Sequence, residues 1–345
     1  MKPSSIARRR QRPPMPDEEK RPSRLGRFWG GPAGLVLRLA IGSVIFIILA
    51  RQFWSEGFID HFSHLQTPRA LLYSSLYLLI FILNRGFMAY KWSILLHPLK
   101  IRLPIRRLIS VYYASTFVGA FLPATVGGDL VRYFLLNLPK GDRPALAASI
   151  LMERVVGLMA LVTVGWFGLM AAWRQDLLPV APALTTLAGG FILVLFAWIS
   201  LVMPPDLLIR RLGPLGRKLS GFASEYQSYR NHPRALCLFY IFSMIESLHG
   251  VVGIWIVALA LDLKIGFLPC LVAVPPMVLL SRVPISVDSL GVFQGLGVLF
   301  FGILGVAGGA AFALGAVRQL LDFIGLLPGG VLWLFLRTSK SSDGR

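Results

Sequence analysis

The sequence predicts an all-α polytopic membrane protein of about eight membrane elements, two of them broken hairpins, arranged as an inverted-topology repeat. Three observations predict this fold. The 345-residue chain is 55% hydrophobic and only 15% charged, and its apolar runs reach the roughly 20 residues that cross a bilayer. Basic residues gather between these runs, as they do in cytoplasmic loops. Two further apolar regions are interrupted by one shared pattern.

The first element is a polar tail. Residues 1–32 carry Arg8–Arg10 and Pro13–Pro14 and are expected to be a disordered, basic, cytoplasmic segment. The apolar run that follows is too long for the apolar part of a signal peptide, and no small-residue cleavage site accompanies it. We therefore expect it to be retained as the first span of a membrane domain over 33–337, which a short cytoplasmic tail, 338–345, follows.

Apolar periodicity and length predict six full spans in this domain. They cover 33–52, 70–90, 145–172, 182–203, 236–261 and 311–336. Regions 108–138 and 267–308 are also apolar, but each contains a proline, a hydroxyl residue and an aspartate where a span has continuous apolar residues. Each is long enough for two legs of a hairpin, either re-entrant or as two short full spans.

The shared interruption is aliphatic, proline, aliphatic, hydroxyl, valine. It reads Leu122-Pro123-Ala124-Thr125-Val126 in one region and Val283-Pro284-Ile285-Ser286-Val287 in the other. In transporters, paired interruptions in opposite halves indicate broken helices with a substrate site between them. The alternative is that they are two unrelated proline kinks.

The distribution of charge predicts the orientation. The N-terminal 30 residues hold nine Lys/Arg and three acids, and the net charge is +19. The basic loops 91–107 and 204–235 and the C-terminal tail are therefore expected in the cytoplasm, and the nearly neutral loops around 53–69, 174–181 and 262–264 outside. This order makes the halves, 33–173 and 182–337, inverted relative to one another. Segment 204–235 alternates leucine with arginine or lysine, which suits either an interfacial amphipathic helix or a solvated loop.

Charged residues inside apolar segments need a partner, water or a function, because each costs roughly 2.5–3.5 kcal/mol at mid-bilayer. The cluster after the first interruption fits a phosphate receptor: Gly127 and Gly128 allow close backbone approach, Asp129 is placed to cap a short helix, and Arg132 follows one turn later. Mutual neutralisation of Asp129 and Arg132 is the structural alternative. The full set of candidate substrate-binding residues is Arg85, Thr125, Gly127, Gly128, Asp129, Arg132, Glu153, Arg154, Ser286, Asp288, Gln294 and Arg318.

Several pairings follow from spacing. Glu153 and Arg154 are adjacent and point about 100° apart on a helix, so each is expected to find a separate partner. Arg318 and Asp322 are four residues apart and can pair on one helix face. Glu246 and His249, three apart, can form a polar pair between helices or relay protons.

The chain shows no catalytic motif and no Cys/His metal pattern, so no catalytic residue, metal ligand or cofactor is predicted. Cys237 and Cys270 both lie in apolar runs, which excludes a disulfide framework. The basic charge, being confined to loops, is an orientation signal and not a sign of nucleic-acid binding.

Two blocks resemble a known family. Residues 117–132 resemble the signature of the lysylphosphatidylglycerol synthase transmembrane (flippase-like) family, and Glu153-Arg154-Val155-Val156-Gly157-Leu158 resembles its Glu-Arg block. Residues 284–294 are similar to a late block of the family, except that Gln294 stands where a glutamate is expected. The resemblance covers roughly 35–335. It implies a lipid-translocating membrane protein, here without the soluble aminoacyl-transferase domain of the bifunctional relatives.

The predicted function is movement of an anionic or polyprenyl-type lipid between the leaflets of the cell inner membrane. Arg132, Arg154 and Arg85 would hold the head group, and Asp129 and Glu153 would orient these arginines or carry protons. No ATPase motif is present, so transport would be passive or ion-coupled. The alternative is a membrane-embedded transferase acting on a lipid-phosphate donor. A third reading, a non-catalytic scaffold, would give the charged residues inside the membrane no function. Membrane lipids are the expected partners, and a homo-oligomer is left open.

Overall fold

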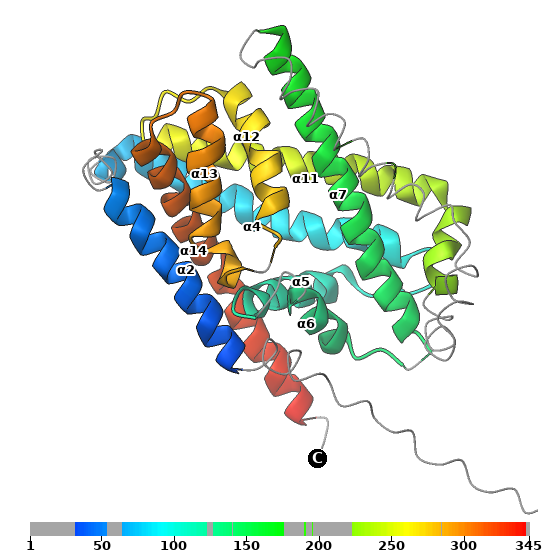
Figure 1. Cartoon of the computed structure of the whole chain (residues 1–345). Helices are drawn as coiled ribbons and strands as arrows, with labels where there is room; N and C mark the ends of the chain where they lie inside the picture. Colours follow the sequence, from blue (N-terminus) through cyan, green and yellow to red (C-terminus); the bar gives the residue numbers. More distant parts are fainter. Residues whose placement is uncertain are drawn as a thin grey trace, which may run out of the picture.

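The computed structural model describes residues 32–53, 64–122, 127–139, 141–175, 223–283 and 285–342, together with the single residues 190 and 195. Within these ranges every regular element is helical and no strand occurs, so the prediction of an all-α polytopic protein is confirmed (Figure 1). The predicted span 182–203, most of the amphipathic segment 204–235, and the outer parts of both tails lie outside the described residues.

Among the described residues, four helices are long and apolar enough to cross a membrane. They are α4 (Pro68–Leu96), α7 (Arg143–Arg174), α11 (Pro233–Ala260) and α14 (Gly308–Ser342), which correspond to the spans predicted at 70–90, 145–172, 236–261 and 311–336. Helix α2 (Pro32–Phe53) covers the span predicted at 33–52. The chain is therefore a multi-pass membrane protein.

Both interrupted regions are pairs of short helices. The first is α5 (Ile105–Ala120) and α6 (Gly127–Leu136), and the second is α12 (Phe267–Leu280) and α13 (Val292–Ile303) with a single turn, η4 (Val287–Ser289), between them. The two legs of each pair pack against one another. Each leg is shorter than the roughly 20 residues that a straight span needs, so the predicted breaks are confirmed. Two more single turns, η2 (His64–Gln66) and η3 (Tyr229–Asn231), lie in connections.

Local sequence explains where several elements begin. The Thr67 hydroxyl accepts a hydrogen bond from the backbone N–H of Ala70 at 3.2 Å, and a proline occupies the first turn of α4, the usual combination at a helix start. At the second break Asp288, Ser289 and Gly291 have φ of 46°, 58° and 77°. A side chain at Gly291 would begin 2.6 Å from the Gly42 carbonyl of α2, so glycine lets this turn and α2 approach closely.

The helix contacts have an internal correspondence. When α4, α5, α6 and α7 are exchanged with α11, α12, α13 and α14, the contacting pairs map onto contacting pairs: α4–α5 onto α11–α12, α5–α14 onto α12–α7, and α6–α7 onto α13–α14. Helices α4 and α11, which exchange with each other, share an extensive contact. This is the pattern that two related halves produce, while the inverted orientation of the halves in a membrane stays a prediction.

The apolar core forms two clusters separated along α4 and α11. One includes Tyr77 and Phe81 of α4 with Val251 of α11, and the other includes Ala89 of α4 with Phe239 of α11. Polar and charged residues of both helices lie between these clusters. Since the clusters occupy opposite ends of spanning helices, the polar layer falls near the middle of the membrane domain.

Loops predicted to share a side of the membrane contact one another. Arg69 and Asp262, both expected outside, form an ion pair at 3.1 Å. At the other end of α4, the buried Tyr229 hydroxyl donates to the Leu95 carbonyl at 2.6 Å, and burial raises the pKa of this phenol. The structure thus groups these loops as the charge pattern predicts, without deciding which group faces the cytoplasm.

Candidate functional site

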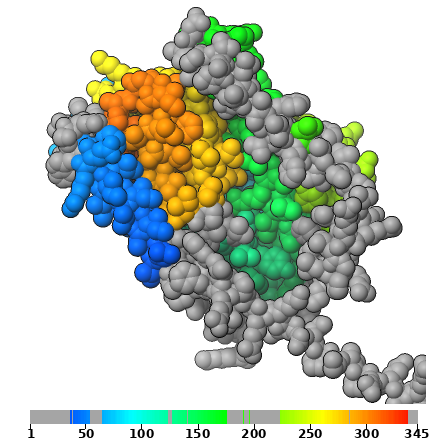
Figure 2. Space-filling model, in the orientation of Figure 1, coloured from blue at the N-terminus to red at the C-terminus, as the bar shows by residue number. Residues whose placement is uncertain are grey.

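A cavity of about 430 Å³ opens between the helices at the level of the polar layer. The view in Figure 2 shows the surface hollowed beside α12 and α13, with atoms of α6 and α7 at the base of the hollow. Side chains from both halves line the cavity, among them six basic and five acidic ones, so the lining carries one more basic group than acidic groups. The charged residues are Arg85, Lys91, Arg132, Arg154, Arg282, Arg318, Asp129, Glu153, Glu246, Asp288 and Asp322.

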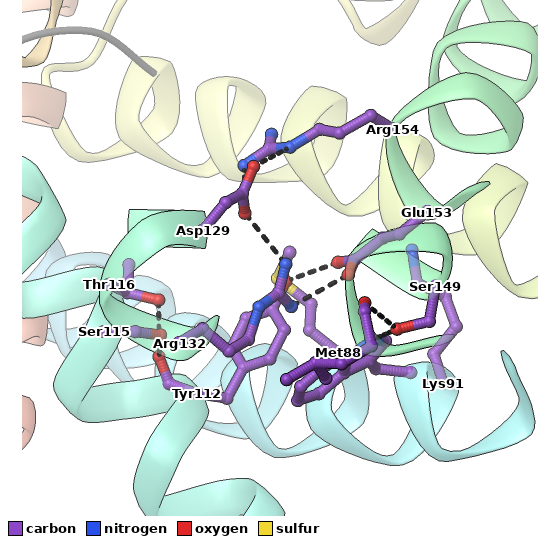
Figure 3. A network of polar contacts seen from close by, with 12 residues as sticks. Met88, Lys91, Tyr112, Ser115, Thr116, Asp129, Arg132, Ser149, Glu153 and Arg154 are labelled. Carbon is purple, nitrogen blue, oxygen red and sulfur yellow. Dashed lines mark hydrogen bonds and ion pairs between the residues drawn. The ribbon is translucent and has the colours of Figure 1, made fainter. Parts of the chain in front are cut away.

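Four charged residues of α6 and α7 form one ion-pair network (Figure 3). Arg132 contacts Asp129 and Glu153, both at 2.8 Å. Arg154 donates to both Asp129 oxygens, at 2.8 and 2.9 Å. The expectation that Glu153 and Arg154 take separate partners is confirmed. Asp129 is not the helix cap that the sequence suggested: it lies inside the first turn of α6, and its carboxylate faces the two arginines.

The two arginines of this network differ in how far their side chains are exposed. Arg132 has a side chain only 2% exposed and lies over the rings of Trp92 and Tyr112, at 4.3 and 4.7 Å. The Tyr112 hydroxyl donates to Glu153 at 2.9 Å. Arg154 is 43% exposed on the cavity side. Arg132 is thus enclosed by its partners, whereas Arg154 can meet a ligand as well as Asp129.

The glycines at the first break bring helices together. A side chain at Gly119 would begin 2.6 Å from the Gly128 Cα, and one at Gly128 would begin 3.1 Å from the Ser115 carbonyl oxygen. Gly128 also lines the cavity. The close backbone approach predicted here therefore takes place between α5 and α6 themselves, which allows Asp129 and Arg132 to reach α7.

The second half has a separate cluster of charged and polar side chains around α14. Arg318 and Asp322 pair at 2.8 Å, as their spacing predicts, and Arg318 lies over the Phe293 ring at 4.2 Å. The Tyr77 hydroxyl donates to Asp322. Asp288, in the turn between α12 and α13, accepts a hydrogen bond from the Gln319 amide at 2.9 Å. Each half thus places an aspartate from its hairpin against a side chain of its last long helix.

A third contact joins α4 to α11. Lys91 forms an ion pair with Glu246 and donates to Ser243 at 3.2 Å. This overturns two expectations: Glu246 pairs with Lys91 and not with His249, and Lys91 is a buried residue of α4 and not part of a basic loop. Because α4 continues to Leu96, six residues beyond the predicted end of the span, the sequence analysis missed Lys91 as a cavity residue.

Arg85, in the middle of α4, differs from the arginines of these networks. Its guanidinium lies over the Phe81 ring at 4.3 Å and contacts the Met88 sulfur at 3.6 Å. Its Nε is buried without a hydrogen-bond partner, and no acid of the described part of the chain lies within 4.0 Å of it. Arg85 is therefore a cavity cation that no acid neutralises directly.

Not every predicted residue reaches the cavity. Gly127, Ser286 and Gln294 are absent from its lining, and Thr125 lies outside the described residues. Gln294 is fully buried: its carbonyl accepts from the Gly291 N–H at 2.7 Å and its amide donates to the Gly315 carbonyl at 3.4 Å. These contacts cap α13 and join it to α14, which gives the glutamine a structural role.

Comparison with protein families gives one match. Residues 35–330 match the lysylphosphatidylglycerol synthase TM region, and the chain belongs to this family. No curated protein and no solved structure matches the chain. The family links this membrane protein to lipid metabolism or transport, and the matched residues include both hairpins and every charged residue of the cavity.

Proposed function

We propose that the protein moves a lipid with an anionic head group, such as a phospholipid or a polyprenyl phosphate, between the leaflets of the inner membrane. The observation that carries this proposal is the unneutralised Arg85 guanidinium inside a polar cavity of membrane helices. An arginine held there without a counter-ion is costly. A phosphate that enters the cavity offsets this cost, because a guanidinium donates two hydrogen bonds to it in one plane.

The surrounding network supports this use of Arg85. Four of the five cavity acids form ion pairs with arginine or lysine, so they do not compete for Arg85. The fixed pairs keep the polar residues in place, while Arg154, which also lines the cavity, offers partly exposed donors. The lipid tails would remain in the bilayer, and only the head group would pass through the cavity.

The two hairpins supply the means of movement. Each ends near the polar layer and touches the last long helix of its half through an aspartate. In transporters built from related halves, rocking of one half against the other exposes a central site to each side in turn. The N- and C-termini are proposed to be cytoplasmic, as the basic residues of both tails indicate.

The experiment measures movement of phosphatidylglycerol with a fluorescent tail label between the two leaflets of proteoliposomes. A quencher added outside removes the fluorescence of the lipids in the outer leaflet and so reports their fraction. Arg85→Gln is expected to slow movement about ten- to a hundredfold, since hydrogen bonds to charged groups contribute about 1.5–3 kcal/mol. Arg69→Gln is the matched control, because Arg69 is 58% exposed and pairs outside the cavity. Equal rates for Arg85→Gln and the wild type would refute the proposal.

A further inference from the structure

Asp288 is the exception among the acids of the cavity. The other four have a basic side chain within 4.0 Å, whereas the described residues bring none that close to Asp288. Its carboxylate accepts only the Gln319 amide hydrogen bond, at 2.9 Å. It lies on an accessible part of the second break. A carboxylate without a counter-ion in a membrane domain is costly unless it binds a cation.

Two residues that adjoin Asp288 carry an oxygen atom with unused hydrogen-bonding capacity. Gln319 donates its amide hydrogen bond to Asp288, and Ser286 directly precedes the turn; Gln319 Oε1 and Ser286 Oγ are both buried and have no hydrogen-bond partner among the described residues. Their residues are only 4% and 6% exposed. Such buried groups cost roughly 1–3 kcal/mol each and call for an explanation. A ligand that accepts electron pairs from oxygen explains both.

The backbone at Asp288 is unwound between two half-helices. Asp288 and Ser289 take left-handed conformations, with φ of 46° and 58°, in a single turn between two half-helices. In transporters, unwound segments of broken helices coordinate the coupling Na⁺ or proton. The turn also packs against α2, where Ser286 approaches Gly42, so movement of this hairpin would carry Asp288 with it.

Charge limits the identity of the ligand. Arg318 and Arg85 act on Asp288 electrostatically, as does Asp322, and Arg282 lines the same cavity from α12. Arg318 is held by Asp322 at 2.8 Å. The described residues contain no group of three or more His, Cys, Asp or Glu side chains placed so that together they could hold a metal ion. One carboxylate with neutral oxygens suits a singly charged ion better than Ca²⁺, which takes six to eight oxygen ligands and several carboxylates.

We propose that Asp288, together with Gln319 and Ser286, binds a monovalent cation, Na⁺ or a proton, and that this binding is coupled to lipid movement. The coupling rests on the proposed function, while the binding itself does not. Binding neutralises the carboxylate, so the hairpin turn can cross between environments of different polarity. Release on the other side restores the charge.

The first experiment measures binding without any lipid movement. Thermal unfolding of the purified protein in nanodiscs is compared in sodium chloride and in choline chloride at equal ionic strength, and in alkaline and acidic buffer. A ligand that binds only the native state raises the melting temperature. We expect Na⁺ or protons to raise it by several degrees in the wild type and in Asp262→Asn, which changes an exposed loop acid, but not in Asp288→Asn.

A second variant separates loss of the cation site from a general folding defect. Gln319→Lys would place an ammonium beside Asp288 as a built-in counter-ion, so this variant should melt at one temperature whatever the cation. The binding proposal is refuted if the wild type shows no dependence on either cation, or if Asp288→Asn keeps the dependence that the wild type shows.

The second experiment tests the coupling. An inward Na⁺ gradient or an inward proton gradient, with the membrane potential clamped, is imposed on proteoliposomes carrying labelled phosphatidylglycerol. One of the two is expected to speed lipid movement several-fold in the wild type and in Asp262→Asn, and not in Asp288→Asn. Lipid movement that neither gradient changes would leave the proposed function standing and refute the coupling. A cation-dependent melting temperature without any lipid movement would leave the cation binding standing and refute the proposed function, and with it the coupling.

Discussion

At the scale of single residues, the cavity separates arginines that hold the structure from one that is free to bind. Arg132 is enclosed by Asp129, Glu153 and two aromatic rings. Arg85 contacts a sulfur and one ring, and the described residues place no acid within 4.0 Å of it. From the sequence alone, Arg132, Arg154 and Arg85 were all expected to be head-group ligands. Spacing along a chain identifies an i,i+3 partner, but it does not show how completely other helices surround a side chain.

This difference predicts opposite effects of substitution. Arg132→Gln is expected to lower the free energy of unfolding by about 3–5 kcal/mol, because it leaves buried carboxylates without their counter-ion. Arg132→Lys should also destabilise the protein, since an ammonium cannot reproduce the planar contacts to two acids and two rings. Arg85→Gln should leave stability nearly unchanged. Thermal melting in detergent measures both, and an Arg132→Gln protein that melts like the wild type would contradict this assignment.

The residues that the sequence analysis missed share one cause. Lys91, Tyr77 and Tyr112 became cavity residues through contacts with distant helices: Lys91 with Glu246, Tyr77 with Asp322, Tyr112 with Glu153. No local pattern marks a tyrosine whose hydroxyl will meet an acid far along the chain. The i,i+4 pair Arg318–Asp322 was predictable because both residues lie on one helix face.

At the scale of elements, the length of the apolar runs was enough to predict the four long helices. The polar interruptions within two other apolar regions were enough to predict the hairpins. The ends of helices were harder to predict. Helix α4 runs on through Lys91 and Trp92 to Leu96 because these side chains are buried against other helices. A charged residue near a predicted end looks like the start of a loop unless its buried partner is known.

Packing at the first hairpin leads to a prediction for Gly128. Gly128→Leu should destabilise the protein, because its Cβ alone would lie 3.1 Å from the Ser115 carbonyl oxygen where α5 and α6 cross, and overpacking typically costs about 1–3 kcal/mol. Gly302→Leu is the control, since nothing lies within 4 Å of a side chain at this exposed helical position. Equal melting temperatures for the two variants would mean that the α5–α6 contact is looser than described.

The start of α13 gives a second prediction at this scale. Gln294→Glu restores the acid that the family resemblance led us to expect, but it replaces the amide that donates to the Gly315 carbonyl with a carboxylate oxygen. A buried charge facing a carbonyl oxygen is unfavourable, so the variant should melt at a lower temperature. Gln294→Glu melting at or above the wild-type temperature would show that this site accommodates an acid.

At the scale of the whole molecule, the orientation of the halves follows from charge and is supported by which loops meet. Cysteine variants of Arg69 and Arg102, in a background without Cys237 and Cys270, should react with impermeant thiol reagents from opposite sides: Arg69→Cys from outside and Arg102→Cys from the cytoplasm. Both positions are exposed. Reaction of both from the same side would contradict the predicted topology and, with it, the inverted repeat.

The central claim is that the head group passes through the cavity, and filling the cavity tests it most directly. Gly157 and Gly250 line it, and nothing lies within 4 Å of a Cβ placed at either, so a larger side chain there begins in open space. Movement of labelled phosphatidylglycerol is compared in Gly157→Leu and in Gly302→Leu, which lies away from the cavity. The proposed path predicts that Gly157→Leu abolishes movement at an unchanged melting temperature while Gly302→Leu moves lipid normally; wild-type movement in a stably folded Gly157→Leu protein would contradict it.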